Sequence, residues 1–333
     1  MKKYNFAIVG ATGLVGQTFL ALLKEYNLPV KELRLFASAK SVGKKIIFDN
    51  KEFYIQELNN NAFKDIDFAL FSAGASVSRK WAPIARDSGA IVVDNSSCWR
   101  MDEECSLIVP EINLEDFYSK SHIIANPNCS TIQAVLPLKA LEEKYHIERI
   151  VYTTYQAVSG SGQKGINDYE ATLKGEEAKF YPYNISKTCI PHIDVFLDNG
   201  YTKEEMKMVN ETKKILHRDD LKISATCVRV PVKVAHGVSV LVEFSNDYDI
   251  DVVRELFRTY PGLVLVDEPQ KNLYPVSTMA IGNDKVYVGR IRRDLSSKKG
   301  LLFYCVADNI RKGAAANAVQ IVEELIKRGE KSC

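Results

Sequence analysis

The chain has 333 residues, of which 46% are hydrophobic and 26% are charged, and this composition is typical of a folded globular protein rather than a disordered or collagen-like one. Its formal net charge is only +2, with no long run of basic residues interleaved with aromatics, so we expect no nucleic-acid partner. No segment approaches the roughly 20 apolar residues of a membrane-spanning helix. The seven cysteines include no C-x-x-C pair, so we expect no metal site, no disulfide framework and a reducing cytoplasm.

Short apolar runs alternate with helical patterns through the first 145 residues. The length of the chain suggests about two domains. Apolar side chains between residues 14 and 26 recur on one helical face. The runs expected to be strands are 5–9, 33–37, 68–71, 91–94, 107–109 and 123–125. This alternation predicts βαβ units, and therefore an α/β, Rossmann-like domain with a mostly parallel sheet over residues 1–127.

A glycine-containing segment, 10–16 (GATGLVG), follows the first expected strand and opens the first expected helix. Unpaired backbone N–H groups at such a turn can bind a pyrophosphate. The spacing is G-x-x-G-x-x-G, with Thr12 and Val15 at the second and third glycine positions of the usual motif, so a plain strand–helix turn is the alternative. The residues expected to bind a dinucleotide here are Gly10, Thr12, Gly13, Leu14 and Val15.

The second expected strand ends in the segment 35–41 (LFASAKS), about twenty residues beyond the glycine turn. NAD enzymes usually offer a carboxylate to the ribose hydroxyls there, and this segment contains none. The hydroxyls of Ser38 and Ser41 and the cation of Lys40 suit a 2′-phosphate. A solvated polar loop is the alternative, but the missing acid favours NADP over NAD.

One cysteine has an activating sequence context. The segment 126–131 (NPNCST) precedes an apolar helical stripe that continues to Tyr145, so Cys129 is expected at a helix N-terminus. The helix macrodipole and free N–H groups there favour a thiolate, the form that attacks a carbonyl. A small buried cysteine is the alternative. We interpret Cys98, Cys227 and Cys305 as core residues.

After residue 145 the expected strands become longer and more clearly alternating. They cover 149–158, 224–232, 236–244, 286–291 and 301–306, and they predict a second, mainly antiparallel sheet. His236 begins one of these strands, although a lone histidine is more often structural. The helical pattern 313–326 has no apparent face to pack on except the first domain. We therefore expect an α+β domain over 128–312, with 313–333 completing the first domain.

These residues resemble the aspartate-semialdehyde dehydrogenase family over nearly the whole chain, most strongly at 126–131. The resemblance implies that Cys129 attacks an aldehyde to give a thiohemiacetal, which passes hydride to NADP and leaves a thioester for phosphate to cleave. The product would be aspartyl phosphate. Biosynthesis of lysine, threonine and methionine would run the reaction in the reductive direction.

The resemblance also implies roles for residues with no local signal of their own. The segment 155–160 (YQAVSG) is similar to the one in which a glutamine, here Gln156, orients the substrate. Arg229 would hold the substrate carboxylate, for which a planar guanidinium is well suited. His236 would be the acid/base that carries the proton.

Further matches concern the phosphate, the amine and the nicotinamide. The resemblance implies that Arg100 and Lys214 bind phosphate, that Glu211 binds the substrate amine and that Asn317 lies near the nicotinamide amide. Without the resemblance, the charged helix expected at 202–218 would be interpreted as a solvated face.

Several alternatives stay open from the sequence. N-acetyl-glutamyl-phosphate reductase shares the fold plan and the thiol chemistry, and a malonyl-CoA reductase is a remoter option. A catalytically silent NADP-binding protein is the alternative outside enzymes. The family resemblance implies a homodimer that pairs through the sheet of the second domain, with a tetramer possible. The expected partners are otherwise a small-molecule substrate and inorganic phosphate, with no membrane.

Overall fold

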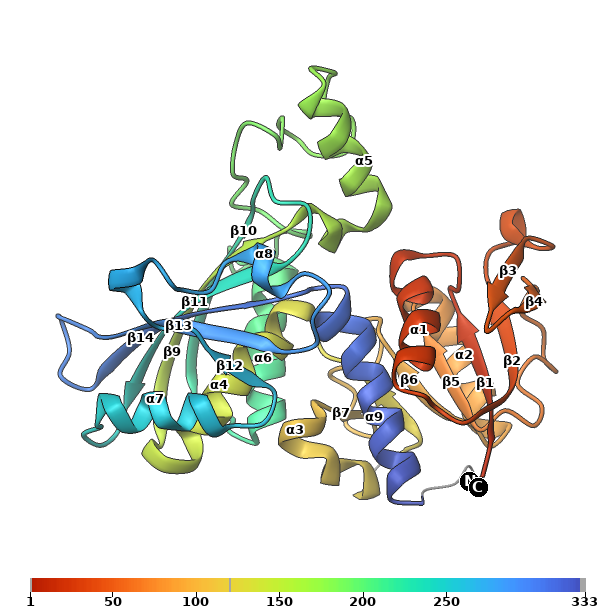
Figure 1. Cartoon of the computed structure of the whole chain (residues 1–333), viewed down its shortest axis with the longest axis horizontal. Helices are drawn as coiled ribbons and strands as arrows, with labels where there is room; N and C mark the ends of the chain where they lie inside the picture. Colours follow the sequence, from red (N-terminus) through yellow and green to blue (C-terminus); the bar gives the residue numbers. More distant parts are fainter. Residues whose placement is uncertain (1, 120, 330–333) are drawn as a thin grey trace. The chain divides into compact units, whose positions relative to one another are not determined.

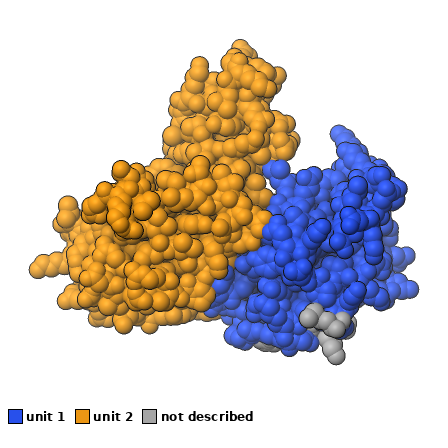
Figure 2. Space-filling view, in the orientation of Figure 1, with its two compact units in different colours: residues 1–127, 314–333 blue, residues 128–313 orange. Residues whose placement is uncertain are grey.

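The structure is a computed structural model that describes residues 2–119 and 121–329. The chain separates into two compact units, shown in different colours in Figure 2. Unit 1 comprises residues 1–127 and 314–333, and unit 2 comprises residues 128–313. Within the described residues, no helix is long and apolar enough to cross a membrane.

Unit 1 contains a six-stranded parallel sheet, as the sequence predicts. Its strand order is β2-β1-β5-β6-β8-β7, and every neighbouring pair is parallel. β5 and β6 are buried along their whole length, because helices cover both faces of the sheet. The strands are β1 (Tyr4–Val9), β2 (Val30–Phe36), β5 (Phe68–Phe71), β6 (Ile91–Asp94), β7 (Ser106–Leu107) and β8 (Ile123–Ala125).

Helices flank this sheet on both sides (Figure 1). α1 (Leu14–Glu25) and the C-terminal α9 (Ala316–Lys327) share one apolar core with the sheet. α2 (Ala75–Asp87) packs in a second core that includes Phe71 and Val92. Unit 1 is thus a three-layer α/β/α arrangement.

The smaller elements of unit 1 lie between these strands and helices. A hairpin of β3 (Lys45–Phe48) and β4 (Lys51–Tyr54) was not predicted, although its turn residues Asp49 and Asn50 both have positive φ, which is a hairpin signal. The remaining elements are η1 (Ala39–Ser41), α3 (Pro110–Asn113) and η2 (Leu114–Ser119), and the turn η5 (Arg311–Ala315) leads into α9.

Unit 2 contains the second six-stranded sheet, in the order β10-β9-β11-β14-β13-β12. The three inner pairs are antiparallel and the two outer pairs are parallel, which confirms the mainly antiparallel sheet. The strands are β9 (Ile147–Gln156), β10 (Lys222–Arg229), β11 (His236–Phe244), β12 (Leu263–Leu265), β13 (Val286–Arg293) and β14 (Gly300–Ala307).

Three helices cover one face of this sheet: α4 (Cys129–Tyr145), α6 (Lys203–Leu216) and α7 (Ile250–Thr259). β9 alternates accordingly, with Tyr152 buried and Tyr155 41% exposed. η3 (Val158–Ser161) and α5 (Gly162–Leu173) follow β9 and form a lobe beyond the sheet in Figure 1. The short elements η4 (Pro269–Lys271) and α8 (Ser277–Ala280) precede β13.

One expectation about burial requires correction, and one helix differs from what its charge pattern alone would indicate. Cys227 and Cys305 are buried, as expected, but Cys98 is only half-buried because it lies in a turn after β6 rather than on a strand. The charged helix α6 is not a solvated face, since Glu204 and Glu211 are buried along it. The partners of these two carboxylates define the centre of the candidate site.

Candidate active site

Cys129 is the first residue of α4, and the residue before it caps the helix. The Asn128 Oδ1 atom accepts hydrogen bonds from the backbone N–H groups of Ser130 at 2.9 Å and Thr131 at 3.3 Å. Cys129 itself is partly exposed. Cys129 therefore lies at a helix N-terminus, where the macrodipole stabilises a thiolate. By contrast, burial raises the pKa of the Cys227 and Cys305 thiols.

Two buried carboxylates of α6 hold Asn128. Its backbone N–H donates to Glu211 Oε2 at 2.6 Å, and its Nδ2 donates to Glu204 Oε1 at 2.9 Å. Glu211 is 1% exposed and Glu204 5% exposed. The two acids are tolerated in the interior because each is hydrogen-bonded, which explains why helix amphipathicity alone misjudged α6.

Gln156, the last residue of β9, meets the same carboxylate. Its Nε2 donates to Glu204 Oε1 at 3.2 Å and lies 3.3 Å from Thr154 Oγ1. One oxygen atom thus binds the amide of Gln156 and the amide of Asn128. This arrangement brings Gln156 beside the residue that precedes Cys129.

The ends of three neighbouring strands converge on the peptide groups of Ala157. Arg229 ends β10 in register with Gln156 on β9, and its Nη1 donates to Ala157 O at 2.7 Å. His236 begins β11 on the other side of β9, and its Nδ1 accepts from Ala157 N at 2.9 Å. The structure therefore brings together Gln156, Arg229 and His236, all of them buried.

The His236 imidazole is held in its neutral form. Burial, reinforced by the nearby charge of Arg229, lowers its pKa from 6.5 to about 3. A backbone N–H can only donate, so Nδ1 carries the lone pair and the proton of the neutral ring is on Nε2. Among the described residues, neither His236 Nε2 nor Arg229 Nε has a hydrogen-bond partner. Both are buried donors available to a bound molecule.

Gly160 lies against these two side chains. A Cβ atom at Gly160 would lie 2.8 Å from Arg229 Nη1 and 3.1 Å from His236 Nε2, closer than a side chain can approach without displacing them. The absence of a side chain at residue 160 thus allows the guanidinium and the imidazole to occupy their positions.

Glu204 adds a fixed negative charge to this cluster. Burial alone would raise its pKa, but Lys207, the hydrogen bond from Asn128 and the charge of Arg229 lower it to about 2. Lys207 Nζ lies 3.0 Å from Glu204 Oε2 and 2.8 Å from Asp194 Oδ2. These interactions therefore hold Glu204 in its ionised form.

Two more predicted residues of unit 2 flank the cluster along α6. Glu211 already accepts from the Asn128 backbone, which the resemblance did not anticipate. Lys214, three residues later on α6, is half-buried. Arg100 belongs to unit 1, where it is buried after β6 and its Nη2 donates to Asn95 O at 3.0 Å.

The glycine segment of unit 1 opens onto a cavity of about 530 Å³. Gly10 has φ +91°, and a Cβ atom there would lie 2.3 Å from Ser72 O, so this position requires glycine. Of the predicted cofactor residues, those lining the cavity are Gly10, Thr12, Gly13 and Ser38. Those outside its lining are Leu14, Val15, Lys40 and Ser41, of which Ser41 is buried.

Sequence reasoning missed several residues that also line this cavity. Ser72 follows β5, and Lys80 and Trp81 lie on α2. For Ser72 a signal was available, because the carboxyl ends of adjacent parallel strands form the crevice in which open α/β sheets bind ligands. Glu57, also unpredicted, contributes a carboxylate to the lining.

Asn317 lies at the start of α9, within unit 1. Its Nδ2 donates to Ile108 O at 2.9 Å and to Asn126 Oδ1 at 2.7 Å. Its Oδ1 is buried and has no hydrogen-bond partner among residues 2–119 and 121–329. The side chain is therefore fixed through its nitrogen and presents an unused acceptor.

Two family models that together match most of the chain show that it is a dehydrogenase of the semialdehyde type. Residues 5–120 match the family model described as semialdehyde dehydrogenase, NAD binding domain, and residues 138–312 match the one described as semialdehyde dehydrogenase, dimerisation domain. The chain belongs to the aspartate-semialdehyde dehydrogenase family, and it is accordingly an oxidoreductase.

Individual relatives support this assignment along the full length. The chain is 52% identical to the aspartate-semialdehyde dehydrogenase of Aquifex aeolicus (strain VF5), with 98% of this chain and 99% of that protein covered. It is 45% identical to that of Bacillus subtilis (strain 168), with 97% of each covered. Aspartate semialdehyde dehydrogenase II of Vibrio cholerae, solved in complex with ASA, is similar with a TM-score of 0.93 and 44% identity over 98% of this chain and 99% of that one.

Proposed function

We propose that the chain catalyses the reversible, NADP-dependent conversion of L-aspartate 4-semialdehyde and phosphate to L-4-aspartyl phosphate, through a thioester on Cys129. The observation that carries the proposal is the placement of Cys129 at the N-terminus of α4, next to Asn128, whose amide shares a carboxylate with Gln156. The biosynthetic direction, in the lysine, threonine and methionine pathway, is reductive. A reducing cytoplasm, which keeps Cys129 unoxidised, is part of the proposal.

The residues of unit 1 fit a dinucleotide. The side-chain-free Gly10 and the cavity of about 530 Å³ suit a pyrophosphate and its adenosine, while the unused Oδ1 of Asn317 suits the amide N–H donors of nicotinamide. A bound NADP would supply the hydride acceptor for the thiohemiacetal, and NADPH would supply the hydride in the reductive direction. Ser38 in the cavity lining suits the 2′-phosphate of NADP, while Lys40 would have to reach it from outside that lining.

The Cys129 thiolate attacks the aldehyde carbon, and the carbonyl electron pair moves to the oxygen. The Nε2–H group of His236 can donate a hydrogen bond to that oxygen as its charge grows. After the hydride has left, the acyl group remains on the Cys129 sulfur as a thioester. A phosphate oxygen then attacks the thioester carbon, the C–S bond breaks, and Cys129 leaves as the thiolate.

The acid/base role proposed for His236 includes a change of hydrogen bonding. With Nδ1 accepting from Ala157, the neutral ring can donate through Nε2 but cannot take up a proton there. Proton uptake at Nδ1 requires the Ala157 bond to break. Donation to the developing oxyanion is therefore the function that this arrangement favours directly.

Four charged residues are proposed to bind the substrate and phosphate. The planar guanidinium of Arg229 suits the substrate carboxylate, and its buried Nε has no hydrogen-bond partner in the described parts of the chain. Glu211 is proposed for the substrate amine. Arg100 and Lys214 are proposed for the phosphate, whose charge a cation compensates.

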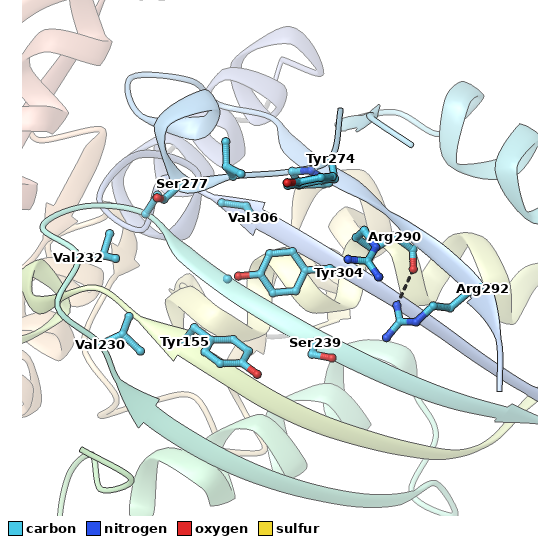
Figure 3. Close-up of a pocket in the computed structure, with 14 residues that line it drawn as sticks. Tyr155, Val230, Val232, Ser239, Tyr274, Ser277, Arg290, Arg292, Tyr304 and Val306 are labelled. Atoms are coloured by element: carbon cyan, nitrogen blue, oxygen red, sulfur yellow. Dashed lines mark hydrogen bonds between the residues drawn. The ribbon is translucent and has the colours of Figure 1, made fainter. Parts of the chain in front are cut away.

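We further propose that the chain forms a homodimer through the face of the second sheet opposite α4 and α6. This face carries a pocket of about 460 Å³, shown in Figure 3, that is lined by aromatic and cationic side chains. The 41% exposure of Tyr155 leaves an aromatic surface for a second copy to cover. The matched model for residues 138–312 is described as a dimerisation domain. A tetramer is the alternative assembly.

The decisive experiment measures NADPH formation by the purified protein with L-aspartate 4-semialdehyde, phosphate and NADP. Replacing Cys129 with Ala should abolish this turnover and leave NADP binding intact. Unchanged turnover in the variant would remove the thioester mechanism. A preference for N-acetyl-glutamate semialdehyde or for a malonyl thioester would assign the alternative enzymes, and NADP binding without any turnover would indicate a silent protein.

A further inference from the structure

Glu204 is a buried carboxylate to which no sequence pattern gave a role. Its Oε1 accepts from Asn128 Nδ2 at 2.9 Å and from Gln156 Nε2 at 3.2 Å. Its Oε2 accepts from Lys207 Nζ at 3.0 Å. Glu204 therefore connects the cap of the nucleophile's helix to the polar end of β9.

An ionised carboxylate can only accept hydrogen bonds, so each amide must turn its NH₂ group toward Glu204. For Asn128 this leaves Oδ1 to accept from the N–H groups of Ser130 and Thr131 and thus to cap α4. For Gln156 it leaves Oε1, the acceptor end of the amide, directed away from Glu204. Glu204 thereby determines which end of each amide is available.

We propose that Glu204 is a positioning residue that orients the Gln156 amide so that its carbonyl oxygen, an acceptor, faces the substrate. The inference rests on the proposed function, in which Gln156 contacts the substrate. The group recognised by Gln156 is then a hydrogen-bond donor, such as an ammonium or the hydroxyl of the thiohemiacetal on Cys129. A negatively charged oxygen would be repelled by this orientation.

The chain supplies a matched control one residue away. Glu205 is also buried on α6, but its carboxylate accepts from the backbone N–H groups of Thr202 at 2.7 Å and Cys227 at 3.1 Å. It therefore caps the helix and binds a strand without contacting either amide. Glu204→Gln and Glu205→Gln remove the same charge from the same helix, and only the first allows the Gln156 amide to reverse.

The first test compares kcat and KM of the wild type, Glu204→Gln and Glu205→Gln with aldehyde, phosphate and NADP. Glu204→Gln should lower kcat by roughly 10- to 100-fold, the size of effect that a displaced site group produces, with the KM for NADP unchanged. Glu205→Gln should lower thermal stability and keep kcat within about threefold of the wild type. Equal kcat values in the two variants would overturn the proposal, whereas an inactive wild type would instead overturn the proposed function.

A second variant keeps the proposal testable if Glu204→Gln does not fold. Lys207→Met leaves both amide bonds to Glu204 but removes the cation that keeps this carboxylate ionised. Because burial then dominates, the pKa of Glu204 should rise, and a protonated Glu204 could donate and release the amides. The kcat–pH profile of Lys207→Met should gain an acid limb that the wild type and Glu205→Gln lack. A profile parallel to that of the wild type would contradict the inference.

Discussion

The backbone N–H of Ala157 donates a 2.9 Å hydrogen bond to Nδ1 of His236, a residue 79 positions later in the chain. The carbonyl of the same residue accepts from Arg229 Nη1. One residue at the end of β9 thus fixes the tautomer of the proposed acid/base and the direction of the proposed carboxylate clamp. This hydrogen bond requires β9 and β11 to pair in register, so the position of the His236 ring depends on the fold of the sheet.

The buried imidazole should make stability depend on pH. Its folded pKa, about 3, lies below the usual 6.5, so the unfolded chain takes up the proton first. The contribution of His236 is complete above pH 6.5 and is lost as pH falls toward the folded pKa. We expect the free energy of unfolding to fall by up to about 1.4 kcal/mol per pH unit in this window. Denaturant unfolding of the wild type and His236→Gln between pH 6.5 and 4.5 should show a shallower slope for the variant. Parallel slopes would show that His236 is not held neutral by burial.

Gly160→Ala should damage the site more than the fold. The new Cβ would lie 2.8 Å from Arg229 Nη1 and 3.1 Å from His236 Nε2, so both side chains must move. We expect kcat/KM for the aldehyde to fall by about 10- to 100-fold, because small displacements of site groups are costly. NADP affinity, measured by fluorescence titration, should not change. A variant with wild-type kcat/KM would mean that this close approach is not needed for catalysis.

Asn128→Ala removes the cap of α4, the helix that begins at the proposed nucleophile Cys129. The loss should cost about 1 kcal/mol of stability and should also slow the alkylation of Cys129 by iodoacetamide, because the thiolate loses an ordered helix N-terminus. Asp249 supplies a matched control, since its side chain caps α7 through the N–H groups of Asp251 and Val252. Asp249→Ala should cost similar stability without changing the alkylation rate. If Cys129 were alkylated at the same rate in Asn128→Ala and Asp249→Ala, the cap would have no influence on the reactivity of Cys129.

Ser38→Asp tests the preference for NADP. Ser38 lines the cavity next to the glycine segment, so a carboxylate there would repel a 2′-phosphate and accept from ribose hydroxyls. We expect NADP binding to weaken by about tenfold or more, corresponding to roughly 1.4 kcal/mol, while NAD binding is kept or improved. Isothermal titration with both cofactors measures the change. Equal weakening for NADP and NAD would place the 2′-phosphate elsewhere.

Tyr155→Glu tests the proposed dimer. Tyr155 lies on the open face of the sheet, 6.1 Å between ring centroids from Tyr304, so a charge there would be buried on pairing of two copies. Sedimentation velocity should show dimers for the wild type and predominantly monomers for the variant. Tyr54→Glu, on the exposed strand β4 of unit 1, makes the same substitution at another exposed tyrosine and should leave the assembly unchanged. A dimeric Tyr155→Glu protein would move the interface to another surface.

Local sequence patterns predict most of the strands and helices and the helix N-terminus at Cys129. Apolar strands alternating with amphipathic helices require a parallel sheet covered on both faces, and β1, β5 and β6 follow that pattern. Cys129 could be placed at a helix N-terminus because capping is local: Asn128 bonds residues only two and three positions away. Such capping hydrogen bonds join residues of one helical turn, so the local sequence is enough to predict them.

The contacts between the polar groups of the site follow from the folded arrangement and not from local sequence. Glu204 lies in the first turn of α6, but its partners Asn128 and Gln156 are 76 and 48 positions away. A charged helix normally exposes its acids, and here α6 buries Glu204 and Glu211 because amide and backbone donors from α4 and β9 replace water. Likewise, strand register aligns Arg229 with Gln156 on β9. A contact between two distant segments does not change the pattern of polar and apolar residues in either segment. Such contacts can therefore be identified only in the folded structure.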